Sequence, residues 1–184
     1  MADKYVDIDT LKYMLYDVHK LEDLLERERF VDHDKESLDM FLESTKDFAD
    51  RELFPFIKEM DEKPAYHKDG KVYVHGQVET MMKKGGELGF ISASFDYDIG
   101  GMQIPLMAHT AATYILDAAN NHLPGYAGLT QGAAELIIHF ASKDLLETFV
   151  PNMLSGKWGG TMCLTEPQAG SSLSDIVTKA KPTQ

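Results

Sequence analysis

Residues 158–175 read WGGTMCLTEPQAGSSLSD. In this stretch the helical pattern of the preceding chain gives way to a strand-like run and a turn of small residues. Thr161–Thr165 is a short run with β-forming residues, long enough to predict one buried strand. Glu166-Pro167 ends this run, because proline cannot donate to a strand ladder and restricts the residue before it. Cys163, the only cysteine, lies within the run, so we expect a packed and unreactive thiol there.

A turn of small residues follows the proline. Gln168–Ser172 combines exposed N–H groups with hydroxyls at Ser171 and Ser172, and Ser174 adds a third hydroxyl nearby. No bulky side chain would separate this backbone from a ligand, so an anion could approach it closely. The residues alone therefore predict a strand followed by a loop suited to a phosphate.

The chain before this stretch has the 3/4 spacing of apolar residues that indicates amphipathic helices. We expect a first helix from Asp9 or Thr10 to about Arg29, and a second from Asp34 toward Phe54, where Pro55 interrupts it. Further helices are predicted over residues 77–88, 105–119, 130–142 and 143–154.

The segments between these helices carry turn signals. Asp69-Gly70 predicts a turn within the connection 63–76, and the apolar, then acidic, residues 90–101 predict an irregular loop. The helix over 105–119 is apolar on most faces and should be the buried central helix. Gly85-Gly86 should weaken the end of the helix before it.

The composition is that of a globular protein with an acidic surface. The 184 residues are 43% hydrophobic and 26% charged, with a net charge of −12, which argues against nucleic acid as a partner. Residues 1–62 carry 19 of the 30 acidic residues but only 9 of the 18 Lys and Arg, as expected of a solvated helical face. One cysteine excludes a disulfide framework, and the absence of a signal peptide or apolar span predicts a cytoplasmic protein.

The predicted fold class is therefore mainly α: about six helices, then the first strand of a β-domain that these residues do not complete. A lone strand cannot satisfy its backbone hydrogen bonds. Either the natural protein continues beyond Gln184, or another chain completes the sheet.

Leu164-Thr-Glu-Pro-Gln-Ala-Gly-Ser171 resembles the T-E-P-x-A-G-S signature of the acyl-CoA dehydrogenases. Leu88-Gly-Phe90 with Gly100-Gly101, and Gly132–Trp158, resemble helical segments of the same family in the same order, although Ile99 replaces a usual aromatic. Together the resemblance covers roughly residues 35–176. Gln168 and the long N-terminal helix are similar to larger bacterial members, of the 3-methylmercaptopropionyl-CoA dehydrogenase type. Ser172 replaces an aspartate of many relatives, which leaves the substrate open.

The resemblance implies FAD as the cofactor and an acyl-CoA as the substrate. Met162, Leu164 and Thr165 would lie along the flavin, whereas Gly170 and Ser171 would approach the FAD pyrophosphate. Ser171 could also touch the acyl-CoA. The family removes an α-proton with a carboxylate base while the β-hydrogen leaves as hydride to the flavin.

That base is a glutamate far downstream in the family, so no catalytic residue is expected within these 184 residues. The counterpart of Glu166 is structural. The implied organisation is an N-terminal helical extension over 1–33, the helical domain over 34–157, and the incomplete start of the middle β-domain over 158–184. The full-length protein would also use an electron-transfer acceptor and form a homo-oligomer, as family members generally do.

A metal site and other functions find less support in the sequence. Seven histidines occur, but without H-E-x-x-H, C-x-x-C or the Glu-His spacing of di-iron bundles, so no metal site is expected. His109 and His139 lie in apolar helices and should be hydrogen-bonded core or pocket residues. Two alternatives stay open: a non-catalytic helical interaction module, and a flavoprotein of the same fold with another activity.

Overall fold

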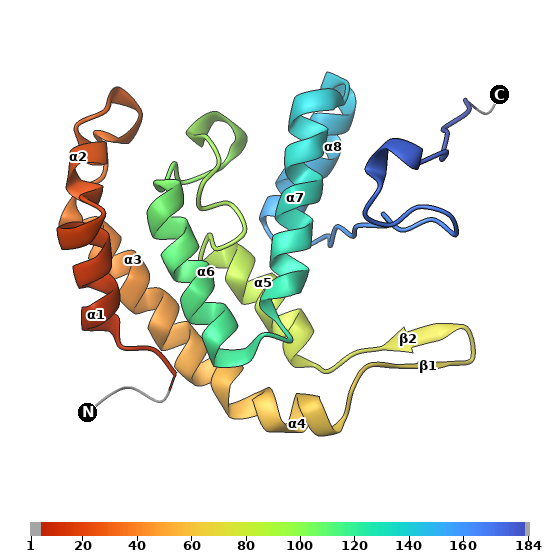
Figure 1. Cartoon of the computed structure of the whole chain (residues 1–184), viewed down its shortest axis with the longest axis horizontal. Helices are drawn as coiled ribbons and strands as arrows, with labels where there is room; N and C mark the ends of the chain where they lie inside the picture. Colours follow the sequence, from red (N-terminus) through yellow and green to blue (C-terminus); the bar gives the residue numbers. More distant parts are fainter. Residues whose placement is uncertain (1–4, 183–184) are drawn as a thin grey trace.

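The computed structural model describes residues 5–182 and is mainly helical, as predicted (Figure 1). Helix α6 occupies the middle of the bundle, with α1 and α3 on one side and α5 and α7 on the other. Fully buried side chains from several elements form one core, among them Leu38, Leu42, Leu53, Ile91 and Ile115. The helices are α1 (Ile8–Tyr13), α2 (Leu21–Leu25), α3 (Lys35–Phe48), α4 (Ile57–Glu62), α5 (Gln77–Glu87), α6 (Leu106–Asn120), α7 (Pro124–Phe140) and α8 (Lys143–Leu154).

The single helix predicted from Asp9 or Thr10 to Arg29 is wrong. Helix α1 is capped instead by Asp7, whose carboxylate accepts from the Thr10 N–H, and it continues as a π-helical turn over Met14–Val18. Lys20 then adopts a left-handed conformation with φ of 52°, so α2 is a separate helix and Glu28–Phe30 a 3₁₀ turn. The wide π turn shifts the phase of the apolar stripe, which a regular 3.6-residue period cannot anticipate.

Helix α3 agrees with its sequence signals. Asp34 and Ser37 form a capping box, each side chain accepting from the backbone N–H of the other. The predicted stripe is buried throughout, at Leu38, Phe41, Leu42, Thr45, Phe48 and Ala49. Pro55 does interrupt this helix: a π turn over Ala49–Leu53 and a 3₁₀ turn over Phe54–Phe56 lead into α4.

The predicted turn at Asp69-Gly70 joins a β-hairpin that projects from the bundle (Figure 1). Strands β1 (Tyr66–Lys68) and β2 (Lys71–Tyr73) are antiparallel, and the exposed rings of Tyr66 and Tyr73 stack with their centroids 5.1 Å apart. Asp69 and Gly70 both have positive φ, 51° and 75°, as a two-residue hairpin turn of type I′ requires.

Helix α7 begins earlier than predicted. The start at Thr130 or Gln131 is wrong, because Pro124 occupies the first turn and the helix runs from there to Phe140. Pro124-Gly125 resembles a turn in sequence, yet proline at the first helical position loses no hydrogen bond. The predicted central helix is confirmed as α6, which buries eight residues, including Ile115 and Leu116.

Two glycines let α5 and the end of α8 approach closely. Gly86 lies inside α5, and a Cβ added to it would lie 2.2 Å from the Ser155 carbonyl oxygen. Gly156 has φ of 72°, and its Cβ would lie 1.8 Å from the Met82 carbonyl oxygen. Gly86 therefore serves close packing within α5, which continues to Glu87.

Residues 158–182 leave the bundle beside α7 and α8 (Figure 1). The strand predicted over Thr161–Thr165 does not form, since no partner strand is present among the described residues. Only Glu166 and Ala169 make an isolated bridge there. The prediction of a packed Cys163 is wrong: the thiol is exposed, because no strand pairs with or covers this run among residues 5–182.

Candidate functional site

The stretch that follows α8 is fixed where it passes α7. The N–H of Gly160 donates to the Thr130 hydroxyl, with N and Oγ1 2.9 Å apart. A Cβ on Gly160 would lie 2.6 Å from the Cβ of Ala133, so only glycine allows this approach. Trp158 packs edge-on against Phe149, with ring centroids 5.5 Å apart. The start of the stretch is thus held against α7 and α8.

The residues predicted to bind the cofactor lie together on the stretch and are exposed. Met162 and Leu164 are 60% and 43% exposed, although both are large and apolar. Thr165, Gly170 and Ser171 are exposed as well. Exposed apolar side chains next to a small-residue turn form a surface that can receive a ligand or another part of a protein.

A tight turn connects the predicted flavin contacts, which end at Thr165, to the predicted pyrophosphate contacts, which begin at Gly170. The N–H of Glu166 donates to the Ala169 carbonyl oxygen over 2.8 Å, and the Ala169 N–H returns a bond to the Glu166 carbonyl oxygen over 3.2 Å. Gly170 follows at once, and a Cβ added there would meet nothing within 4 Å. The backbone at Gly170 is therefore open to close approach.

The Glu166 carboxylate accepts four hydrogen bonds. Its donors are the side-chain amide of Gln168, the N–H of Val177, and both the N–H and the hydroxyl of Thr178. The Thr178 hydroxyl and the Val177 N–H lower the pKa of Glu166 to about 2. Sequence reasoning missed Val177 and Thr178, because they lie beyond the motif and carry no signal of their own.

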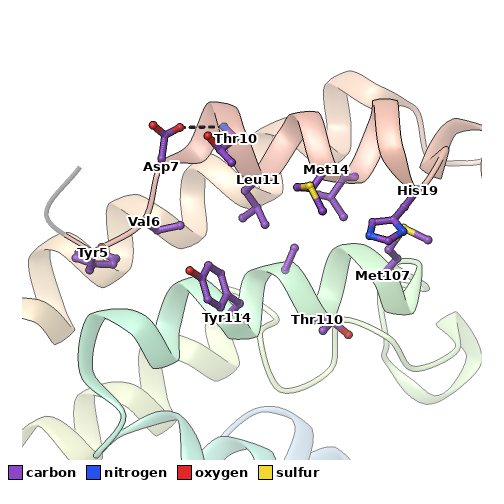
Figure 2. A pocket seen from close by; sticks show the side chains of 12 residues that line it. Tyr5, Val6, Asp7, Thr10, Leu11, Met14, His19, Met107, Thr110 and Tyr114 are labelled. Atoms are coloured by element: carbon purple, nitrogen blue, oxygen red, sulfur yellow. Dashed lines mark hydrogen bonds between the residues drawn. The ribbon is translucent and has the colours of Figure 1, made fainter. Parts of the chain in front are cut away.

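A groove of about 870 Å³ lies elsewhere, between α6 and the segment formed by α1 and the π turn that follows it (Figure 2). Its walls are largely apolar, and the one dashed contact in the view is the Asp7–Thr10 cap. None of the predicted site residues lines it. The lining residues are Tyr5, Val6, Asp7, Thr10, Leu11, Met14, Leu15, His19, Met107, Thr110, Ala111 and Tyr114.

His109 lies on α6 and is buried, as predicted for a core or pocket residue. It is 9% exposed, and its Nδ1 has no hydrogen-bond partner. Burial lowers the pKa of His109, and a hydrogen bond with Gln131 opposes this in part. Gln131 in turn donates to the Ser94 hydroxyl over 3.1 Å. His139 is exposed instead, with its Nδ1 2.9 Å from the Glu135 carbonyl oxygen.

Within residues 5–182, no group of three or more His, Cys, Asp or Glu side chains could hold a metal ion. In the same range, the helices are too short or too polar to cross a bilayer.

Residues 35–157 match the sequence family described as acyl-CoA dehydrogenase, N-terminal domain. The chain belongs to the acyl-CoA dehydrogenase family. It is 30% identical over 141 residues to the 3-methylmercaptopropionyl-CoA dehydrogenase of Ruegeria pomeroyi, covering 77% of this chain and 24% of that protein. It is also 42% identical over 81 residues to a butyryl-CoA dehydrogenase of Syntrophomonas wolfei, covering 44% of this chain and 13% of the relative.

Solved structures of acyl-CoA dehydrogenases share the fold. The glutaryl-CoA dehydrogenase of Mycobacterium smegmatis superposes with a TM-score of 0.68 at 20% identity, covering 80% of this chain and 35% of that one. The butyryl-CoA dehydrogenase of Megasphaera elsdenii gives a TM-score of 0.62 at 23% identity, covering 77% and 35%. The chain spans about a third or less of the length of these relatives. The predicted family and mainly helical fold are thus confirmed.

Proposed function

We propose that this chain is the N-terminal part of an FAD-dependent acyl-CoA dehydrogenase, which introduces an α,β double bond into an acyl-CoA thioester. One observation carries the proposal: the family match over residues 35–157 is followed by Leu164–Ser171, the T-E-P-x-A-G-S string, on an exposed stretch. Helical domain and string occur in the order typical of the family.

The residues of the stretch fit an elongated, partly anionic cofactor. In this proposal Met162 and Leu164 cover the flavin ring, and their exposure leaves them free to do so. The Thr165 hydroxyl binds the polar edge of the ring. Gly170 and Ser171 approach the pyrophosphate, and the open space over Gly170 supports that role. Ser171 also contacts the acyl-CoA.

Bound FAD would supply the hydride acceptor. The residues of this chain hold and orient that group, and none of them is assigned as the base. Glu166 is a poor candidate because its carboxylate is engaged by four donors, which stabilise the charged form and weaken it as a proton acceptor. We place the carboxylate base outside residues 1–184, in agreement with the family resemblance.

We further propose the division of the chain into a helical extension (1–33), the helical domain (34–157) and the start of the β-domain (158–184). The full-length protein would act in the cytoplasm as a homo-oligomer, and it would pass electrons to a separate acceptor protein. The acyl group it prefers stays open.

The decisive experiment uses the full-length natural protein. We expect it to purify with FAD or to take it up, and we expect one member of an acyl-CoA panel to bleach the flavin absorbance without oxygen. A charged substitution in the proposed flavin contact, Leu164→Asp, should reduce FAD binding. Leu145→Asp is a matched control, since Leu145 is 48% exposed on α8 and outside the site.

The outcomes separate the alternatives. A full-length protein that cannot be loaded with FAD would refute the proposal. Flavin binding without bleaching by any acyl-CoA would instead indicate a flavoprotein with another activity. A natural reading frame that stops near residue 184, with a folded and flavin-free product, would indicate a helical interaction module.

A further inference from the structure

The hydrogen bonds of Glu166 connect two parts of the stretch that are far apart in sequence. Glu166 Oε2 accepts from the Val177 N–H over 3.0 Å, and Oε1 accepts from the Thr178 N–H over 2.9 Å. These partners lie 11 and 12 residues downstream. The side chain therefore closes a loop that contains both Gly170 and Ser171.

Other hydrogen bonds inside this loop are short-range. The Glu166–Ala169 turn, the Asp175 N–H bond to the Ser172 carbonyl oxygen and the Ile176 N–H bond to the Leu173 carbonyl oxygen each span three residues. Such contacts shape local turns but do not fix the distance between the loop's two ends. Among the described residues, the hydrogen bonds that link the two ends of the loop are those of the Glu166 carboxylate with Val177 and Thr178.

We propose that Glu166 is the positioning residue of the cofactor loop: its carboxylate clamps Val177 and Thr178, and so holds the backbone at Gly170 and Ser171 in place. This inference rests on the proposed function and deepens it, because the loop held by the clamp is the one assigned to the FAD pyrophosphate. A loop ordered before binding loses less conformational freedom when its ligand arrives.

The charge and shape of the carboxylate both matter to the clamp. Its two oxygens face N–H donors, so an amide in its place would turn an NH₂ group toward one of them. Glu166→Gln should therefore fail almost as completely as Glu166→Ala. Thr178→Ala removes only the hydroxyl and retains both N–H donors, and its effect should be smaller and in the same direction.

The test uses the full-length protein and three measurements. Amide hydrogen exchange at Val177 and Thr178 in the FAD-free protein reports the clamp directly. The dissociation constant of FAD reports its consequence, and the melting temperature of the FAD-free protein reports the fold. Glu147→Gln is the control, because it makes the same charge change at an exposed i,i+4 pair on α8.

We expect Glu166→Gln and Glu166→Ala to speed exchange at both amides and to weaken FAD binding about ten- to a hundredfold, as loss of loop ordering implies. The FAD-free melting temperature and the Glu147→Gln variant should match the wild type. Unchanged exchange in the Glu166 variants, or FAD binding within about twofold of wild type, would overturn the inference. A wild-type protein that binds no FAD would refute the proposed function instead, while the exchange measurement would still test the clamp.

Should the Glu166 variants fail to fold, Thr178→Ala tests the same contact from its other side. Faster exchange at Thr178 with a weaker FAD complex supports the clamp. Wild-type values for both would contradict it.

Discussion

Thr130 and Gly160 join the helical bundle to the cofactor stretch through one hydrogen bond, 2.9 Å from the Gly160 nitrogen to the Thr130 hydroxyl oxygen. The same hydroxyl donates to the Tyr126 carbonyl oxygen over 2.7 Å, so it is satisfied on both sides while fully buried. A side chain on α7 thereby sets where the exposed stretch begins.

Thr130→Val should destabilise the protein by about 1–3 kcal/mol, because the partly buried Gly160 N–H loses its acceptor. Urea denaturation measures this. Thr148→Val is the control, since Thr148 also donates to the carbonyl four residues before it but is exposed on α8. If the two substitutions lowered the free energy of unfolding equally, the hydrogen bond from Gly160 would contribute nothing to stability.

Gly86→Ala should cost several kcal/mol or prevent folding, since its methyl group would overlap the Ser155 carbonyl group. Gly132→Ala places the same methyl group in α7, where nothing lies within 4 Å. Gly132→Ala should therefore stabilise the protein by about 0.5–1 kcal/mol, because alanine has the higher helix propensity. Thermal unfolding compares the two, and a tolerated Gly86→Ala would contradict the close packing of α5 and α8.

Asn120→Leu should destabilise the fold by about 2 kcal/mol or more, because two backbone groups lose their partner. The fully buried Asn120 side chain donates to the Leu53 carbonyl oxygen over 3.0 Å and accepts from the His122 N–H over 3.2 Å. Asn121→Leu is the control: Asn121 is exposed, so this change should alter the free energy of unfolding by less than about 0.5 kcal/mol. Chemical denaturation of both variants checks this, and a stable Asn120→Leu protein would count against the network.

His109 should stay neutral at pH 7 and titrate below 6.5, its ordinary value, because burial disfavours the imidazolium. A lowered folded-state pKa means that the stability contribution is complete above pH 6.5 and is lost as pH falls through the lower value. NMR titration of the imidazole, assigned with His109→Gln, measures the pKa directly. A midpoint at or above 6.5 would contradict the buried environment.

Local signals in the sequence predicted much of the bundle. Asp34 marks the start of α3, the apolar positions of α5 follow one helical period, and the largely apolar faces of α6 predicted its central place. The break at Lys20 escaped prediction because a π turn and a left-handed residue have no composition signature. The predicted start of α7 is too late, because a proline at a helix start, such as Pro124, looks the same in sequence as a proline in a loop.

The candidate site was predictable only in part. The string Leu164–Ser171 identified the stretch, yet a strand over Thr161–Thr165 needs a partner strand, and none pairs with it among the described residues. The Glu166 clamp could not be predicted, because Val177 and Thr178 donate through backbone groups that every sequence offers.

Residues before the family match share the core of those within it. Leu21 is fully buried, and the π turn buries Leu15 and Tyr16, whereas the family match begins at residue 35. Lys12 adds ion pairs with Asp39 and Glu43 on α3. The family match over residues 35–157 is thus shorter than the segment that shares one hydrophobic core. A chain shortened to begin at Asp34 would keep every family motif and still expose an apolar flank of α3 and α6 to water.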